Sequence, residues 1–200
     1  MLIRPVDRAL DEAEWRAFLA DHDFGQLIVP MGDGLPVVVP THFVFDRSGD
    51  LLFHLANENP ACAALGTGRE VLFTVIGAYA YIPTTWNANP GSDVRYGIPT
   101  SYYATVQLAG TASLTDDPGA LAGILTRQLA HFQPEGGHAP VDLGDQPYGR
   151  ALANIRGVRL AVRSAQAKFK FGGNKSAAHR LLIAERLQER GRPLDLEARD

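Results

Sequence analysis

The sequence has little cysteine and no long apolar run. Its 200 residues contain one cysteine, Cys62, which excludes an internal disulfide and a cysteine-based zinc site and is typical of a protein from a reducing cytoplasm. No apolar segment approaches the about 20 residues of a membrane-spanning helix, and the charged residues near the start exclude a signal-peptide core. We therefore expect a cytoplasmic protein without a membrane segment.

The sequence also has no excess of positive charge, with 19 lysine and arginine residues against 22 aspartate and glutamate residues. The formal net charge is −3 and the pI is about 6.1, which argues against the basic surface of a stand-alone nucleic-acid-binding protein and restricts any DNA contact to a local patch. A hydrophobic content of 46% is enough for a sizeable core. We expect a single domain over residues 1–200, with a C-terminal helix over residues 176–190.

Several catalytic motifs are absent from the sequence. It contains no G-x-S-x-G, no H-E-x-x-H, no G-x-x-x-x-G-K-[ST] and no G-x-G-x-x-G after a predicted strand, which argues against hydrolase and dinucleotide-binding folds. Four of the six histidines have no paired spacing typical of a metal site, and we interpret them as surface residues: His22, His131, His138 and His179.

The hydrophobic pattern is mainly that of β-strands, with a few flanking helices. Alternating or continuous apolar runs predict strands over residues 24–30, 35–46, 51–56, 70–76, 101–114 and 158–162, and over the lysine-containing segment near 168–171. Residues 78–82 are expected either to continue the strand over 70–76 or to form its neighbour. Helical spacing and capping residues predict helices over residues 10–21, 60–65, 118–132 and 176–190. Residues 83–99 resemble a long ordered loop. A closed barrel is the arrangement that we expect, because it leaves no exposed strand edge.

All three lysines of the chain lie in one short segment, Lys168 to Ser176. Strand alternation places Lys168 and Lys170 on one face, and Lys175 stands just before a helix that Ser176 can cap. The positive end of a helix beside lysines is favourable for an anion such as a phosphate. The same pattern is also typical of a strand edge that is merely kept solvated by charge.

Two histidines lie in predicted neighbouring strands. His42 and His54 could share one wall of a pocket, together with Asn59 at the start of the short helix, or each could be a buried histidine bonded to backbone groups. Tyr81 and Trp86 could either pack at the barrel mouth or stack on a planar ligand.

Five stretches in this order resemble the PaiB family, whose members are proposed negative transcriptional regulators built on the FMN-binding split barrel of pyridoxamine-phosphate oxidases. The stretches span nearly the whole chain. They are Pro40-Thr41-His42, His54 to Pro60, Ala80 to Trp86, Ile98 to Tyr102, and Lys168 to Ser176.

The resemblance implies a homodimer with FMN at the subunit interface. It places the phosphate near Thr41, His42 and the helix after Asn59, and implies ring contacts from Tyr81 and Trp86. Split-barrel flavoproteins usually carry a cation on that short helix, whereas this chain has Pro-Ala-Cys-Ala-Ala over residues 60–64. A phosphate there would lose charge-assisted hydrogen bonds. Compensating cations are therefore expected in the lysine segment, at Lys168, Lys170 and Lys175.

Three functions follow as hypotheses, and no catalytic residue is indicated for any of them. The first is an FMN-binding protein with possible redox activity. The second is a regulator that contacts DNA or a protein partner through residues 168–190, with or without flavin. The third is a haem-binding or haem-degrading split-barrel protein with His42, His54 or His179 as the axial ligand.

Overall fold

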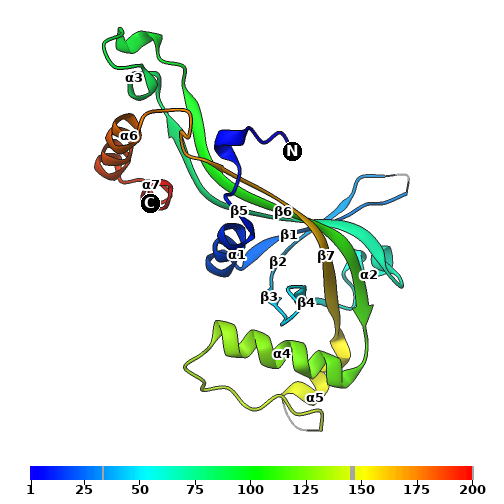
Figure 1. The fold of residues 1–200 in the computed structure, drawn as a ribbon. Helices are drawn as coiled ribbons and strands as arrows, with labels where there is room; N and C mark the ends of the chain where they lie inside the picture. Colours follow the sequence, from blue (N-terminus) through cyan, green and yellow to red (C-terminus); the bar gives the residue numbers. More distant parts are fainter. Residues whose placement is uncertain (33, 145–146, 200) are drawn as a thin grey trace. The chain divides into compact units, whose positions relative to one another are not determined.

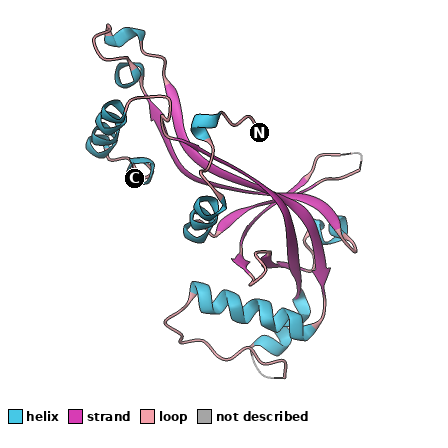
Figure 2. Ribbon diagram, in the orientation of Figure 1, coloured by secondary structure: helices cyan, strands magenta, loops and turns pink. Residues whose placement is uncertain are grey.

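The computed structural model describes residues 1–32, 34–144 and 147–199. Its strands form one sheet in the order β2-β1-β5-β6-β7-β4-β3 (Figure 1), and helices flank this sheet (Figure 2). This is the split-barrel fold predicted from the sequence. The strands are β1 (Phe24–Val29), β2 (Val37–His42), β3 (Val44–Phe45), β4 (Leu51–Ala56), β5 (Arg69–Ile82), β6 (Thr100–Thr115) and β7 (Ile155–Lys170).

The helices are short, and most begin where the sequence predicts. They are α1 (Glu12–Asp21), α2 (Pro60–Leu65), α3 (Thr84–Asn87), α4 (Pro118–Phe132), α5 (Tyr148–Ala151), α6 (Ala177–Arg190) and α7 (Asp195–Arg199), with 3-10 turns η1 (Pro5–Asp7), η2 (Val94–Tyr96) and η3 (Leu152–Asn154). In the part of the chain that the structure describes, none of the helices combines the length and apolar character needed to cross a bilayer.

Side-chain caps explain the helix starts. The side chain of Asp11 accepts a hydrogen bond from the backbone N–H of Glu14, and Asn59, Asp117 and Ser176 do the same at the starts of α2, α4 and α6. Each cap satisfies a backbone donor that the first helical turn leaves without an intrahelical partner.

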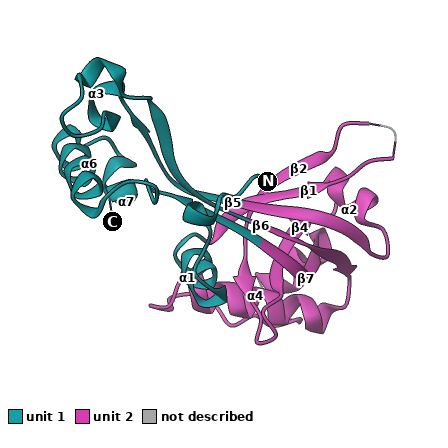
Figure 3. Ribbon diagram, turned by 45° about the horizontal axis from the view of Figure 1, so that its top comes forward, with its two compact units in different colours: residues 1–22, 75–106, 166–200 teal, residues 23–74, 107–165 magenta. Residues whose placement is uncertain are grey.

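The chain divides into two compact units, which are described separately (Figure 3). Unit 1 comprises Met1–His22, Val75–Val106 and Gln166–Asp200, and unit 2 comprises Asp23–Thr74 and Gln107–Ala165. Strands β5, β6 and β7 therefore contribute residues to both units. The assignment of residues 1–200 to one folding domain stays a prediction.

Unit 2 has an aromatic core. Phe43, Phe53 and Phe73 are almost completely buried, and the rings of Phe43 and Phe73 meet edge to face with centroids 5.1 Å apart. Strand β1 pairs with β2 in antiparallel register, with Gly25 opposite Thr41, and β4 pairs with the first part of β7. The alternation of strand side chains then places Thr41 and His42 on opposite faces of the sheet.

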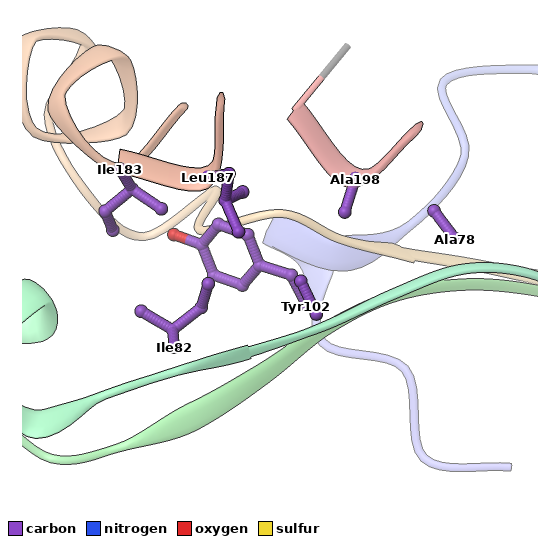
Figure 4. Packing of buried hydrophobic residues seen from close by; sticks show 7 residues of the cluster. Ala78, Ile82, Tyr102, Ile183, Leu187 and Ala198 are labelled. Atoms are coloured by element: carbon purple, nitrogen blue, oxygen red, sulfur yellow. The ribbon is translucent and has the colours of Figure 1, made fainter. Parts of the chain in front are cut away.

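Unit 1 has a separate core under its C-terminal helices. Tyr102 from β6 lies against Ile183 and Leu187 of α6 and near Ala198 of α7, with Ile82 of β5 below (Figure 4). Burial of these apolar side chains fixes α6 and α7 on the strands of this unit.

Residues 70–76 and 78–82 form one strand that continues through Gly77, which is one of the two arrangements expected from the sequence. Three other expectations about the strands and loops are corrected by the structure. The predicted strand over 35–46 is two strands. The loop 83–99 contains α3 and η2. Among the described residues the sheet is open, with β2 and β3 as its edge strands, whereas a closed barrel was expected.

Candidate functional site

The lysines line one cavity in unit 1, which we call the lysine cavity. Its volume is 460 Å³, within the usual range of about 300–1,000 Å³ for small-molecule sites. It collects residues from the N-terminus, the segment before β6 and the end of β7. The lining residues are Leu2, Arg4, Val6, Asp7, Asn87, Ile98, Pro99, Thr100, Tyr102, Lys168, Lys170, Gly172, Asn174 and Lys175.

Among the described residues, the three ammonium groups donate hydrogen bonds to neutral oxygens. Lys168 Nζ donates to the carbonyl of Leu2 at 3.0 Å, and Lys170 Nζ donates to Thr100 Oγ1 at 2.6 Å. Lys175 Nζ donates to the carbonyl of Asn87 at 3.1 Å and to Asn89 Oδ1 at 3.2 Å. These acceptors position the lysines without neutralising their charge.

The charge balance of the lysine cavity is strongly positive. Arg4 and the three lysines line it, and Asp7 is the only carboxylate among the described residues that do so. Like charges gathered at one surface raise each other's energy, and an anion that enters between them relieves this repulsion. The cavity therefore has the electrostatics of an anion site.

Tyr102 lines this cavity and carries a buried hydroxyl, which Figure 4 shows on the side of Ile183 in α6. The residue is 4% exposed, and among the described residues its Oη has no hydrogen-bond partner. Burial raises the pKa of the Tyr102 phenol, so it stays a neutral donor at pH 7. Gly172, with φ of +73°, makes room for it, because a Cβ there would lie 2.1 Å from Tyr102 Oη.

Asn87 contributes a second buried group to the lysine cavity. Its side-chain N–H₂ donates to the carbonyl of Ile98, whereas its Oδ1 is buried without a partner in the described part of the chain. Orphaned buried polar groups are uncommon in folded proteins and each calls for an explanation. Tyr102 Oη and Asn87 Oδ1 together give this cavity a donor and an acceptor for a bound molecule.

Tyr81 and Trp86, the predicted ring contacts, lie in unit 1 but are not among the residues that line the lysine cavity. Trp86 packs against the hydrophobic cluster of this unit, and the guanidinium of Arg190 lies 4.7 Å from the centre of its ring. Tyr81 is 46% exposed. Its backbone carbonyl accepts a hydrogen bond from Arg190 Nη1 at 2.7 Å.

His42 and His54 meet in unit 2, as the strand pattern predicted. Their ring centroids are 5.7 Å apart in an edge-to-face arrangement. Both line a cavity of 610 Å³, the histidine cavity. Its lining residues are Asp23, Phe24, His42, His54, Leu125, Gln128, Leu129, Phe132, Gln133, Glu135 and Tyr148.

The pKa of His42 is lowered. Burial disfavours the charged imidazolium, and the neighbouring His54 adds to this effect, while Asp23 acts in the opposite direction. His42 is therefore neutral at pH 7.

Thr41 and Asn59, the other two predicted cofactor contacts, do not line the histidine cavity. Thr41 is 7% exposed, and its hydroxyl donates to the carbonyl of His42 at 3.1 Å. Asn59 Oδ1 accepts the N–H of Ala61 at 3.0 Å and so caps α2. On α2 itself Ala61 and Cys62 are buried, which explains why small apolar residues stand there.

One histidine interpretation was wrong. His179 is 5% exposed rather than a surface residue, and its Nε2 lies 3.0 Å from the carbonyl oxygen of Trp86. Since that carbonyl can only accept, Nε2 carries a proton and is not free to bind an iron atom. As an axial ligand, His179 would have to bind through Nδ1.

Sequence reasoning missed Arg4, Asn87, Thr100 and Tyr102 in the lysine cavity, and Gln128 in the histidine cavity. Each comes from a segment far along the chain from the lysines or the histidines that it joins. The available signal was weak. Thr100 and Tyr102 lie in a stretch that resembles the family, and Gln128 is a polar residue on the apolar face of a predicted helix.

Comparison with known proteins gives a family match. A family model described as "Putative FMN-binding domain" matches residues 1–164. The Bacillus subtilis (strain 168) protein named Protease synthase and sporulation protein PAI 2 is 25% identical over 181 residues, which cover 88% of this chain and 84% of that protein. The sequence resemblance to the PaiB family is thereby confirmed.

Two solved structures are similar in fold. The flavocytochrome Anf3 from Azotobacter vinelandii has a TM-score of 0.62 and 18% identity, with 82% of this chain and 69% of that chain covered. The FAD and heme binding protein from Mycobacterium smegmatis has a TM-score of 0.61 and 18% identity, with 87% and 78% covered. At these identities the likeness concerns the fold alone.

Proposed function

The chain belongs to the FMN-binding-domain family, and on this premise we propose that it binds FMN with the phosphate held in the lysine cavity. The observation that carries the proposal is the cavity itself, which all three lysines and Arg4 line together with Tyr102, a residue whose buried hydroxyl has no hydrogen-bond partner among the described residues. A phosphate dianion in such a site gains several charge-assisted hydrogen bonds.

The residues present fit a phosphate. Lys168, Lys170 and Lys175 are each fixed by a neutral oxygen and retain donor capacity, because an ammonium group has three N–H bonds. Tyr102 Oη adds a neutral donor. These groups replace the cation that is missing from α2, where residues 60–64 carry no charge. A bound flavin would supply electron-transfer chemistry, and these residues would anchor it by its phosphate.

The other predicted contacts, Thr41, His42, His54, Asn59, Tyr81 and Trp86, stay predictions. For the two aromatic residues the proposal is specific. The ring of Trp86 is already covered by Arg190, whereas Tyr81 is half-exposed, so Tyr81 is the better candidate for contact with a flavin ring. A Tyr81→Ala variant that bound FMN and riboflavin as tightly as the original protein would remove this contact from the proposal.

Titration with FMN, followed by the flavin absorbance and by quenching of flavin fluorescence, tests the phosphate site. The double variant Lys168→Gln/Lys170→Gln should weaken FMN binding about 100-fold, since two charge-assisted bonds to the phosphate become neutral ones. Riboflavin, which lacks the phosphate, should lose little. Arg47→Gln/Arg127→Gln is the matched control, because it removes two exposed charges that do not line the cavity.

Two outcomes would contradict the proposal. In the first, FMN binds to the lysine variant as tightly as to the original protein at equal thermal stability. In the second, both double variants weaken FMN binding equally, which would indicate a general effect of net charge. Absence of any binding of FMN to the unaltered protein would reject flavin binding itself.

We further propose a regulatory role, as a homodimer that represses transcription, which is the role implied by the resemblance to the PaiB family. Redox activity is the competing role for a flavin-binding protein. Light scattering tests the dimer, and a salt series of binding to the DNA upstream of its own gene tests the regulation. Phosphate contacts by lysine and arginine make DNA affinity fall steeply with salt. Binding that is absent or independent of salt would contradict DNA contact.

The haem alternative keeps its three candidate ligands, His42, His54 and, through Nδ1, His179. It is favoured by one observation, the fold likeness to a FAD and heme binding protein. Addition of haem should give a Soret band that a His42→Ala or His54→Ala change abolishes. A spectrum that is the same with and without the protein would reject haem binding.

A further inference from the structure

The histidine cavity contains a buried polar group that the flavin proposal does not use. Gln128, on α4, is 4% exposed, and its Nε2 has no hydrogen-bond partner among the described residues. An amide N–H₂ group without an acceptor loses the hydrogen bonds that it makes in water, so a buried one marks a place where an acceptor belongs. The residue lines the cavity, so that acceptor can come from a bound molecule.

The hydrogen bond between His54 and Gln128 determines which nitrogen of His54 carries the proton. His54 Nδ1 lies 2.8 Å from Gln128 Oε1. An amide oxygen only accepts, so His54 Nδ1 carries the proton and His54 Nε2 has a free lone pair in the neutral ring. The pair therefore offers a ligand one N–H donor from Gln128 and one acceptor nitrogen from His54.

The rest of the wall is apolar and aromatic. Leu125, Leu129 and Phe132 lie on the same face of α4 as Gln128, since the spacings of three and four residues match the helical turn. The ring of Phe132 meets that of His42 edge to face at a centroid distance of 4.9 Å. Such a wall suits a flat aromatic molecule.

The charge of the cavity excludes an anion. Asp23 and Glu135 line it, and within the described residues no lysine or arginine does. His42 is neutral at pH 7 and adds no positive charge. A phosphate or carboxylate would meet two carboxylates and no cation, the reverse of the lysine cavity.

We propose that the histidine cavity is a second binding site, and that it takes a neutral aromatic molecule carrying a carboxamide or lactam group. The carbonyl of that group accepts from Gln128 Nε2, its N–H donates to His54 Nε2, and its ring packs on Leu125, Leu129 and Phe132. The site is distinct from the phosphate site, because all of its lining residues belong to unit 2 and those of the lysine cavity belong to unit 1.

Benzamide and benzoate are matched probes for this proposal, because they have the same ring and differ in one group, an amide or a carboxylate. We expect benzamide to shift the side-chain N–H₂ signals of Gln128 saturably in nitrogen-15 NMR spectra. Benzoate should bind at least about tenfold more weakly, because it brings a charge and lacks the N–H donor. This comparison uses the unaltered protein and does not depend on the folding of a variant.

Variants on α4 give the second test. Gln128→Met keeps the side-chain length but removes the amide, and should weaken benzamide binding about tenfold or more. Arg127→Gln, one residue earlier and exposed, should bind as the unaltered protein does. Thermal unfolding of both variants shows whether the fold is retained.

Three results would overturn the proposal. The first is no saturable shift of the Gln128 signals with benzamide, which would leave the amide to water. The second is equal binding of benzoate and benzamide. The third is displacement of benzamide by riboflavin, which would assign the cavity to the flavin ring. Lysine variants that lose FMN but keep benzamide binding would support separate sites and would leave the flavin proposal intact.

Discussion

The ion pair between Arg190 and Asp195 should be a major source of stability in unit 1. Asp195 is 2% exposed, and its two carboxylate oxygens accept from Arg190 Nε at 2.8 Å and from Arg190 Nη2 at 2.6 Å. The backbone N–H of Arg192 also donates to Asp195 Oδ2 at 3.0 Å. The pair joins the end of α6 to the start of α7, and the side chain of Arg190 is itself only 16% exposed.

We expect Asp195→Asn to lower the free energy of unfolding by about 3 kcal/mol. Removal of one partner from a buried pair costs about 3–5 kcal/mol, because it leaves an uncompensated charge. The lower end applies here, since Arg190 keeps its bond to the carbonyl of Tyr81 and its contact with the ring of Trp86. For a chain of this size, such a loss corresponds to a fall in Tm of about 6–12 °C.

Urea unfolding followed by tryptophan fluorescence is a suitable assay, because Trp86 lies directly against Arg190. The matched control is Asp93→Asn. Asp93 also pairs with an arginine, Arg95, through more than one hydrogen bond, but the Arg95 side chain is 79% exposed. Exposed pairs contribute little, so the control should unfold at nearly the same urea concentration as the original protein.

The effect should also depend on pH. The hydrogen bonds from Arg190 hold the pKa of Asp195 below its ordinary value. Stability from a carboxyl with a lowered pKa is present above the unfolded-state pKa of about 3.9 and is lost as the pH falls through the folded-state pKa. The gap between the original protein and Asp195→Asn should therefore be full at pH 7 and shrink in acid. If the two proteins differ in free energy of unfolding by less than about 1 kcal/mol at pH 7, or if the difference is unchanged in acid, the ion pair does not stabilise unit 1 in this way.

Three further predictions concern single groups. Gly172→Ala should lower the free energy of unfolding by about 1–2 kcal/mol from the positive φ alone, which calorimetry measures. It should also weaken FMN binding in a titration, because the new Cβ would displace Tyr102 Oη. Thr105→Val should cost about 1–2 kcal/mol in urea unfolding, since it deletes a buried 2.8 Å hydrogen bond to the carbonyl of Val75. In NMR titrations His42 should protonate at a lower pH than a free histidine, and His54→Gln should raise that pKa whereas Asp23→Asn should lower it further. Each prediction has a contradicting result: an ordinary pKa for His42, or an unchanged free energy of unfolding for Gly172→Ala or for Thr105→Val.

Helix starts were predictable because their causes are local. Each of four helices is capped by the side chain just before it, from Asp11, Asn59, Asp117 or Ser176, and such a cap depends on only a few neighbouring residues. The fold class was predictable for a different reason. It came from five short stretches in family order, none of which determines a fold by itself.

Strand boundaries were less predictable, because contacts from distant segments decide them. The predicted strand over 35–46 breaks at Phe43, whose N–H bonds to the carbonyl of Asp23 instead of a ladder partner. Strand β5 runs on through Gly77, which is one of the two arrangements that the sequence left open. A Cβ at this position would lie 2.6 Å from the ring of Phe18, so glycine is needed there for close packing in unit 1.

The candidate site could be predicted only in part. The lysine segment was identifiable, because its composition is unusual in a lysine-poor chain, and His42 and His54 were identifiable as a pair from their strands. The unpartnered groups of Tyr102, Asn87 and Gln128 were not, because an orphaned donor or acceptor exists only after the chain has folded around it.

The concentration of lysine in a single cavity has a practical consequence for chemistry on this protein. An amine-reactive reagent has three side-chain targets in this sequence, Lys168, Lys170 and Lys175. All three lysines line the lysine cavity. The rate of acylation of the lysine side chains would therefore report on that cavity. A bound anion should slow the reaction, and the extent of slowing would measure how much of the cavity is occupied, without any engineered label.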